Sequence, residues 1–216
     1  ENFNQQLFTT MSISQEEKLS QLIETTIDYY LSKNKLTSWQ ELVALWGAGE
    51  DLSQWELPEW ITKQPSNYKA NSYGTEQIQY IFGLLAAGKD PSKAWETNTN
   101  LYEDLASQQI ENGSIGGINK HLFAMLALKT GKELGHYSWD DAKEQKALEF
   151  LLNQEISGGG FALFGDYPDT DITGMVILTL GLYQNDTAVQ ATIERAKAIL
   201  KQKQLDNGGF ISDGDW

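Results

Sequence analysis

The chain alternates between two kinds of hydrophobic segment. In the first kind, apolar residues recur at spacings of three and four, as at Val189, Ile193 and Ala196, which is typical of a helix with one exposed face. In the second kind, residues 122–128 and 175–183 are apolar at nearly every position, which predicts helices buried on every side. The alternation predicts an all-α protein with an inner layer of buried helices and an outer layer of amphipathic ones.

The approximate bounds of these helices follow from the same pattern. We expect outer helices near residues 15–33, 53–63, 99–109, 140–154 and 187–203. We expect inner helices near residues 38–48, 75–88, 119–130 and 170–184. Each outer helix except the last is followed by an inner one, so the predicted unit is a helical hairpin.

Local signals mark some of the helix starts. Ser14 with Glu17, and Ser38 with Glu41, have the spacing of a capping box, in which the serine begins the helix. Acidic residues on outer helices, such as Glu144, are expected to belong to solvated faces.

The second outer segment is the least regular one. Pro58 and Pro65 limit any helix there to a short piece. The aromatic side chains of this region are expected to pack a long connection; they are Trp55, Trp60 and Tyr68.

A glycine turn recurs along the chain. Gly113, Gly159 and Gly208 each follow a helix end that carries Gln, and they lie 46 and 49 residues apart. This period is about the length of one two-helix hairpin with its loops. The sequence therefore predicts an array of stacked hairpins.

One of these units carries a family likeness. Residues Asn153–Tyr183, NQEISGGGFALFGDYPDTDITGMVILTLGLY, resemble the prenyltransferase and squalene-cyclase repeat. Gly88–Pro91 followed by Asn100–Ser114 is similar to bacterial surface proteins that carry such repeats, distant relatives of transcobalamin and intrinsic factor. The resemblance covers roughly residues 39–216. It implies an α/α toroid that holds ligands at the mouth of its inner barrel, and an extracellular, cell-surface location.

The ring is expected to be incomplete. Residues 1–216 are read as one toroid domain, since chains of this length are routinely single units. The resemblance implies six helix pairs in a closed ring, which is more than the predicted helices supply. An inner helix is expected after Gly208–Phe210, but the chain stops at Trp216, so we expect a fragment of a longer surface protein.

Composition excludes several kinds of function. Lys and Arg number 16 against 30 for Asp and Glu, and the resulting charge of −14 would repel a nucleic-acid backbone. The absence of cysteine excludes disulfides, thiolate zinc sites and cysteine nucleophiles, and it fits many secreted Gram-positive proteins. No apolar run reaches the roughly 18 residues of a membrane span, so membrane insertion is not expected.

The catalytic signatures of the related enzymes are broken here. Protein prenyltransferases hold zinc through Asp, Cys and His, and this chain has no Cys. Class II terpene cyclases use a DxDD acid, and the nearest match, Asp169 to Ile172, lacks the final acid. Asp169 and Asp171 can instead begin the helix that follows. An enzyme is therefore disfavoured, although a degenerate cyclase or a carbohydrate-active toroid with two facing carboxylates stays open.

Metal and cofactor sites have only weak support. Calcium could bind the clustered acids of either Gly-rich turn, Asp166, Asp169 and Asp171 or Asp206, Asp213 and Asp215, although no EF-hand spacing is present. Cobalt coordination by His121 or His136 is only implied by the family resemblance. We expect no cofactor.

The candidate site is the rim formed by the starts of the inner helices. Unpaired N–H groups there suit polar or anionic groups, and nearby aromatics supply flat apolar contact. The rim residues are Tyr73, Asn119, His121, Phe164, Tyr167, Asp169 and Asp171. The alternatives are that His121 satisfies the start of its helix and that Phe161, Phe164 and Tyr167 pack the hairpins. We predict a non-catalytic binding module for a small molecule, a glycan or a protein partner.

Overall fold

The computed structural model describes the backbone of residues 3–33 and 35–211, and the side chains of that part from Glu17 onward. Within it the chain forms eight α-helices, four short 3-10 helices and three isolated bridge pairs, with no strand. The prediction of an all-helical fold is confirmed for these residues.

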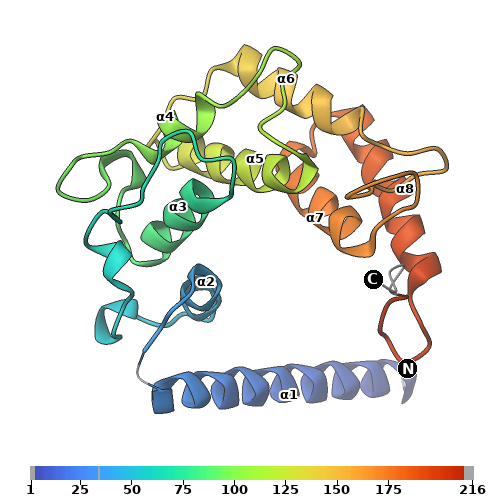
Figure 1. Cartoon of the computed structure of the whole chain (residues 1–216). Helices are drawn as coiled ribbons and strands as arrows, with labels where there is room; N and C mark the ends of the chain where they lie inside the picture. The colour runs from blue at the N-terminus through green and yellow to red at the C-terminus, as the bar shows by residue number, and fades with distance from the viewer. Residues whose placement is uncertain (1–2, 34, 212–216) are drawn as a thin grey trace.

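The helices form an arch with an inner and an outer layer (Figure 1). The inner helices are α2 (Trp39–Gly47), α3 (Glu76–Ala86), α5 (Ile118–Glu133) and α7 (Thr170–Leu180). The outer helices are α4 (Leu101–Ala106), α6 (Asp141–Leu152) and α8 (Thr187–Lys203). Consecutive inner helices contact one another, and each outer helix contacts an inner neighbour. The hairpins predicted from the glycine turns are therefore stacked side by side.

The first helix differs from its prediction. α1 spans Phe3–Lys33, and Ser14 lies inside it, so the helix start predicted at Ser14 is wrong. Because the helical backbone continues on both sides of Ser14, no capping residue is needed there. The capping box at Ser38 is confirmed: Glu41 N–H donates to Ser38 Oγ at 3.3 Å, and Ser38 N–H donates to Glu41 Oε2 at 3.0 Å.

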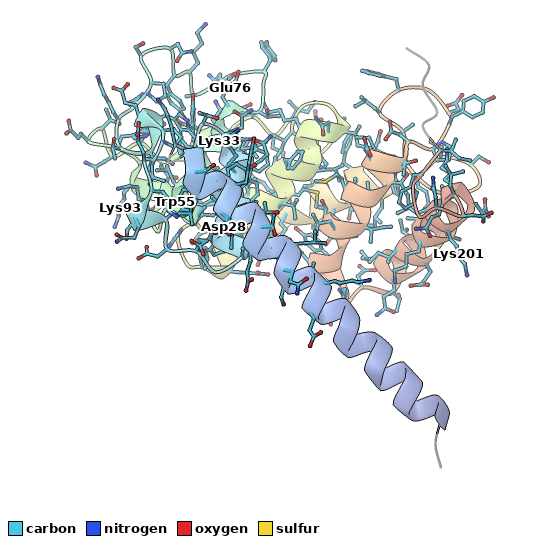
Figure 2. All side chains as sticks on the ribbon, turned by 90° about the horizontal axis from the view of Figure 1, so that it is seen from below. Asp28, Lys33, Trp55, Glu76, Lys93 and Lys201 are labelled. Carbon is cyan, nitrogen blue, oxygen red and sulfur yellow. The ribbon has the colours of Figure 1, made fainter. Side chains whose placement is uncertain are left out.

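Among the described side chains of α1, from Glu17 onward, those near its C-terminal end pack against the rest of the protein. Figure 2 shows this part, near Asp28 and Lys33, crossing the body while the other end of the helix extends beyond it. Ile27 and Tyr30 pack on the core, whereas Leu22 is exposed.

The outer helix expected at 53–63 does not form. The structure has two 3-10 helices there, η1 (Leu52–Gln54) and η2 (Glu59–Ile61), because Pro58 has an extended ψ of 143° that separates them. Trp60 packs on Tyr80 with ring centroids 5.5 Å apart. The prediction that aromatics pack this connection is confirmed.

The three glycine turns share one geometry. Each glycine has a positive φ, which favours glycine over residues with a side chain: 92° at Gly113, 98° at Gly159 and 85° at Gly208. Each glycine N–H donates to a carbonyl three residues earlier, at 2.9 Å for Ile110, 3.0 Å for Ile156 and 2.8 Å for Leu205. The turns are thus equivalent points in successive hairpins.

The inner helices are not equally buried. Helix α5 contacts α3, α4, α6 and α7, and residues such as Met125 are fully buried. On α7, Leu178 is 59% exposed, and Leu182, on the 3-10 helix η4 (Gly181–Tyr183) that follows, is also exposed, so the prediction that this segment is buried on every side is wrong. The reason is that α7 has fewer neighbours than α5 in the described part of the chain, chiefly α5 and α8.

One acidic residue of the outer layer is buried. Glu144 on α6 accepts a hydrogen bond of 2.8 Å from Lys129 and another from Lys132, both on α5. Burial opposes ionisation of Glu144, but the two lysines outweigh it and lower the pKa of its carboxyl group below the usual value. The expectation of a solvated Glu144 is wrong because its partners lie on another helix.

Candidate functional site

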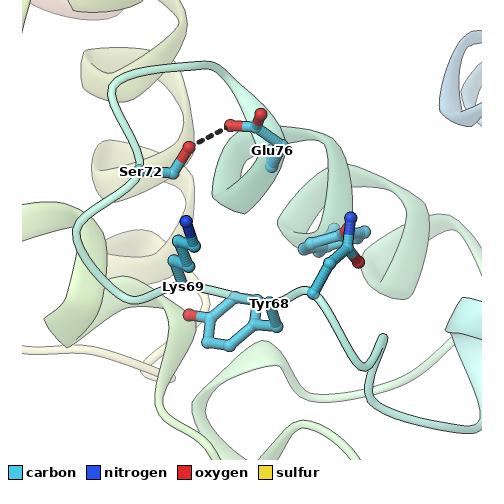
Figure 3. A pocket seen from close by; sticks show the side chains of 6 residues that line it. Tyr68, Lys69, Ser72 and Glu76 are labelled. Carbon is cyan, nitrogen blue, oxygen red and sulfur yellow. Dashed lines mark hydrogen bonds between the residues drawn. The ribbon is translucent and has the colours of Figure 1, made fainter.

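A polar pocket lies at the start of α3, where the connection from η2 returns to the inner layer (Figure 3). Its volume is about 270 Å³. Its walls are Asn67, Tyr68, Lys69, Ser72, Glu76 and Tyr80. We call it the α3 pocket.

The connection that forms one wall is held by a buried side chain of α3. Gln77 is fully buried, and its Nε2 donates to the carbonyl oxygens of Lys69 at 2.5 Å and Ala70 at 3.0 Å. Gln108, at the end of α4, also donates to Ala70 O at 3.0 Å. Because hydrogen bonds from two elements fix this loop backbone, the pocket wall is pre-formed.

Lys120, near the start of α5, ties the next inner helix to the same loop. Its Nζ donates to Ser72 O and to Gln108 Oε1, both at 2.7 Å. Burial lowers the pKa of Lys120, and the carboxylate of Glu76 opposes this effect. The ammonium group of Lys120 therefore helps to fix the loop residue Ser72, which lines the pocket.

Glu76 supplies a negative charge to the pocket. It lies in the first turn of α3 and accepts a hydrogen bond of 2.5 Å from the Ser72 hydroxyl, drawn in Figure 3. This bond is the main reason that the pKa of Glu76 is lowered. Lys69 lies between Tyr68 and Ser72 in the same view. The pocket thus presents an ionised acceptor and a cationic donor.

Two aromatic rings, Tyr68 and Tyr80, also line the pocket. The Tyr68 hydroxyl donates a hydrogen bond to the carboxylate of Asp104. Burial raises the pKa of Tyr68, so the phenol stays neutral. Its ring lies 6.0 Å from that of Tyr80 and 5.3 Å from that of Trp95, at steep angles. The contact with Trp95 is edge-to-face and that with Tyr80 is tilted, and together they hold the Tyr68 ring in place.

A second pocket continues the first along the connection. It has a volume of about 500 Å³ and shares Asn67 and Tyr80 with the α3 pocket. Its other walls are Glu59, Trp60, Lys63, Gln64, Pro65 and Ser66. The two hollows adjoin at Asn67 and Tyr80 and have aromatic and polar walls, and we call them together the groove.

The residues expected at the rim fall into two groups. Tyr73 and Asn119 are exposed. Tyr73 follows Ser72, which lines the α3 pocket, and Asn119 precedes Lys120, whose Nζ contacts Ser72 O. Phe164 is 79% exposed on the loop before α7.

Tyr167 is exposed on the same loop as Phe164. Within the described residues, neither of these rings contacts Tyr73 or the other. Phe161, by contrast, is fully buried and packs the hairpin.

His121 is inside the protein. Its Nδ1 accepts a hydrogen bond of 3.0 Å from Ile115 N–H, so Nε2 carries the proton and donates to Ala147 O at 3.0 Å. Burial lowers the pKa of His121 to about 4. Both nitrogens are engaged, which matches the alternative of a histidine at a helix start whose own hydrogen bonds are satisfied. His136 lies elsewhere, with Nδ1 3.6 Å from Asp90 Oδ1.

The acidic pair before α7 serves the helix. Asp169 is its N-cap and accepts a hydrogen bond of 2.9 Å from Ile172 N–H, as the capping interpretation predicts. Asp171 is exposed in the first turn. In the described part of the chain no group of three or more acidic or histidine side chains is placed to hold a metal ion, Asp166, Asp169 and Asp171 included. Asp213 and Asp215 lie outside the described residues.

Sequence reasoning missed most of the α3 pocket. Of the predicted rim residues, Tyr73 is the chain neighbour of a residue that lines the pocket, Ser72. The pocket residues Ser72 and Glu76 lie four residues apart, which is not the capping-box spacing, and the structure uses Thr75 as the N-cap.

Comparisons with known protein families, with curated protein sequences and with solved structures give no match to this chain. Among the described residues, no helix combines the length and the apolar character that crossing a membrane requires.

Proposed function

We propose that the protein is a non-catalytic, extracellular binding module of the α/α-toroid type, which holds a hydroxyl-rich ligand such as an oligosaccharide in the groove at the start of α3. The observation that carries this proposal is the pairing of aromatic rings with hydrogen-bonding groups along two adjoining hollows. Sugars offer an apolar face for rings and hydroxyls for polar groups, and binding pockets commonly divide their lining in this way.

The toroid part of the proposal is supported by the two layers of the arch. Inner helices follow one another around a curve, with outer helices behind them (Figure 1). The arch spans part of a ring, in keeping with an incomplete toroid. The location at the cell surface is supported by the family resemblance and by the lack of cysteine.

The charge state of the pocket favours binding over acid catalysis. A general acid needs a raised pKa, as a carboxyl group in an apolar site has. Glu76 has a lowered pKa, because Ser72 donates to its carboxylate. Ionised Glu76 is suited to accept hydrogen bonds from ligand hydroxyls, with Asn67 and Lys69 as further polar partners.

A thermal-shift screen with oligosaccharides, prenyl lipids and cobinamides tests the proposal. A ligand that binds the native state raises the melting temperature by mass action, and we expect oligosaccharides to do so. Glu76→Gln and Asn67→Ala should remove that shift, whereas the exposed control Glu111→Gln should keep it. A shift by oligosaccharides that survives both pocket variants would refute the site. Glycan turnover that Glu76→Gln abolishes would refute the non-catalytic assignment.

A role of the exposed rim aromatics in ligand binding stays a prediction. We expect alanine at Tyr73, Phe164 or Tyr167 to weaken ligand binding, because flat exposed rings add contact area. Their exposure implies little loss of packing, so the melting temperature should change by only a few degrees. Unfolding of these variants with unchanged affinity per folded molecule would make the rim a packing feature instead.

A further inference from the structure

Trp95 has a backbone conformation that is unfavourable for a large side chain. Its φ is 60°, in the left-handed region, and Asn98 in the same loop has a φ of 52°. Asparagine tolerates this region, whereas a tryptophan there is an exception, and such exceptions persist only where the surrounding structure imposes them. The contacts of the loop and of the indole ring must therefore hold Trp95 in place.

The loop that carries Trp95 is closed at its base. Ala94 and Thr99 exchange two backbone hydrogen bonds of 2.9 Å each, and Asn98 N–H donates to Trp95 O at 3.2 Å. The loop follows the 3-10 helix η3 (Pro91–Lys93) and leads into α4. Because its two ends are tied together, the loop backbone sets the direction in which the indole ring leaves it.

The indole of Trp95 contacts three aromatic residues, all of which line the groove. Its Nε1–H donates to Trp60 O at 2.7 Å, and its ring lies edge-to-face against the rings of Tyr68 and Tyr80, with centroids 5.3 and 5.5 Å apart. The ring of Tyr80 in turn lies 5.5 Å from that of Trp60 and 6.0 Å from that of Tyr68. Trp95 thus joins the aromatic walls of both hollows into one cluster.

Trp95 itself lies outside the groove. Among the described residues that line its two hollows, Trp95 is absent. It lines a separate hollow of about 360 Å³, whose walls include Ile61 and Leu84. A ligand in the groove therefore meets the three aromatic residues but not Trp95, so any effect of Trp95 on binding acts through those three.

Helix α3 limits the Trp60 ring from another side. A Cβ placed on Gly83 would stand 2.2 Å from Cη2 of Trp60, so the ring lies directly against a position of α3 that has no side chain. The ring of Trp60 is thus held by α3 and its carbonyl group by Trp95. Two separate elements fix the residue that forms the aromatic wall of the second hollow.

We propose that Trp95 is a positioning residue of the groove, which fixes Trp60, Tyr68 and Tyr80 in the arrangement that an oligosaccharide meets. Its strained backbone aims the indole at all three residues at once. The effect on oligosaccharide affinity rests on the proposed function. The effect on the position of the rings does not, and it can be measured without a ligand.

Fluorine NMR of protein labelled with 5-fluorotryptophan measures this ligand-free effect. Trp95→Phe keeps a ring beside Tyr68 and Tyr80 but removes the N–H that holds Trp60 O, so the Trp60 signal, assigned with Trp60→Phe, should move or split. The control Trp46→Phe makes the same change at a tryptophan that is 57% exposed on α2, and it should leave the Trp60 signal in place. An unmoved Trp60 signal in folded Trp95→Phe would overturn the proposal.

Titration with cellohexaose measures the effect on binding. Its flat glucose units offer apolar faces to rings, so it is a suitable probe. Loss of one hydrogen bond that orders Trp60 should raise its Kd about fivefold in Trp95→Phe and leave it unchanged in Trp46→Phe. An unchanged Kd in Trp95→Phe would overturn the positioning role. Moved rings without cellohexaose binding by the unchanged protein would support that role and count against the glycan groove.

The unchanged protein provides a test that does not depend on the folding of any variant. Exchange of the Trp95 indole N–H with solvent should be slow, because this group donates to a backbone carbonyl. In the complex with cellohexaose, nuclear Overhauser effects from the sugar should reach Trp60 and Tyr80 but not Trp95. Fast exchange of this N–H, or a direct effect from the sugar to the Trp95 ring, would contradict the proposal.

Discussion

His121 on α5 and Thr173 on α7 accept equivalent backbone hydrogen bonds in successive hairpins. His121 accepts the N–H of Ile115 at 3.0 Å, and Thr173 accepts the N–H of Phe161 at 3.0 Å. Each acceptor fixes the residue that follows a glycine turn against the inner helix that comes next. The same hydrogen-bond pattern therefore recurs in two repeats of the chain, although the residue types differ.

Histidine in this role makes stability depend on pH. The pKa of His121 is about 4 in the folded protein, below its value of 6.5 in the unfolded chain. As pH falls below 6.5 the unfolded chain takes up a proton first, so stability declines until about pH 4 and then levels off. The loss should reach up to about 3 kcal/mol.

The variant His121→Gln isolates this effect. It keeps an acceptor for Ile115 N–H but does not titrate, so urea unfolding should show a flatter decline between pH 6.5 and 4 than in the unchanged protein. The carboxyl groups of the chain are the same in both proteins, so their titration cancels in the comparison. Parallel pH profiles would contradict the burial of a neutral His121.

Alanine at two turn glycines should have unequal effects. Gly113→Ala places a Cβ against Lys146 O and strains a positive φ, so α6 must move, and we expect a loss of about 3 kcal/mol or more. Gly208→Ala strains a similar φ in open space, and about 1 kcal/mol is expected. Chemical denaturation of both variants provides the comparison, and equal losses would contradict the close crossing of α6 over the first turn.

The buried carboxylate of α6 should matter more than its exposed neighbour. Glu144→Gln removes the charge that Lys129 and Lys132 share, and we expect a loss of about 1 to 3 kcal/mol at neutral pH. Because the pKa of Glu144 is lowered on folding, its stabilisation is present above pH 4.5 and is lost as the pH falls through the folded value.

The control for this prediction is Glu149→Gln, on an exposed position of the same helix. It should change the free energy of unfolding by less than about 0.5 kcal/mol. If Glu144→Gln is as mild as the control at pH 7, the ion pair between α5 and α6 does not stabilise the fold.

The sequence was sufficient for elements whose signals are local. The starts of α5 and α7 were predicted to within one residue, because Gly117 precedes the apolar run of α5 and Asp169 can cap the run of α7. The helix predicted at 53–63 does not form because Pro58 interrupts it, and the position of the two short pieces depends on distant aromatics: Trp95 Nε1 donates to Trp60 O across 35 residues of chain. Periodicity within a segment carries no signal of that contact.

The candidate binding site was harder to predict from the sequence for the same reason. The α3 pocket is braced by Lys120, which lies 48 residues from the Ser72 carbonyl that it contacts. Sequence placed Tyr73 and Asn119 at a common rim, because inner helices of a stacked array begin on one side. It could not show that Ser72 and Glu76 bond to each other beside Tyr80.

Backbone NMR during titration with the oligosaccharide that most raises the melting temperature tests the central claim most directly. We predict that the largest saturable shifts occur at the amides of Asn67, Ser72 and Glu76, and that Glu76→Gln abolishes them. Shifts confined to Phe164 and Tyr167, or no saturable shift with any oligosaccharide of the panel, would contradict a glycan-binding groove at the start of α3.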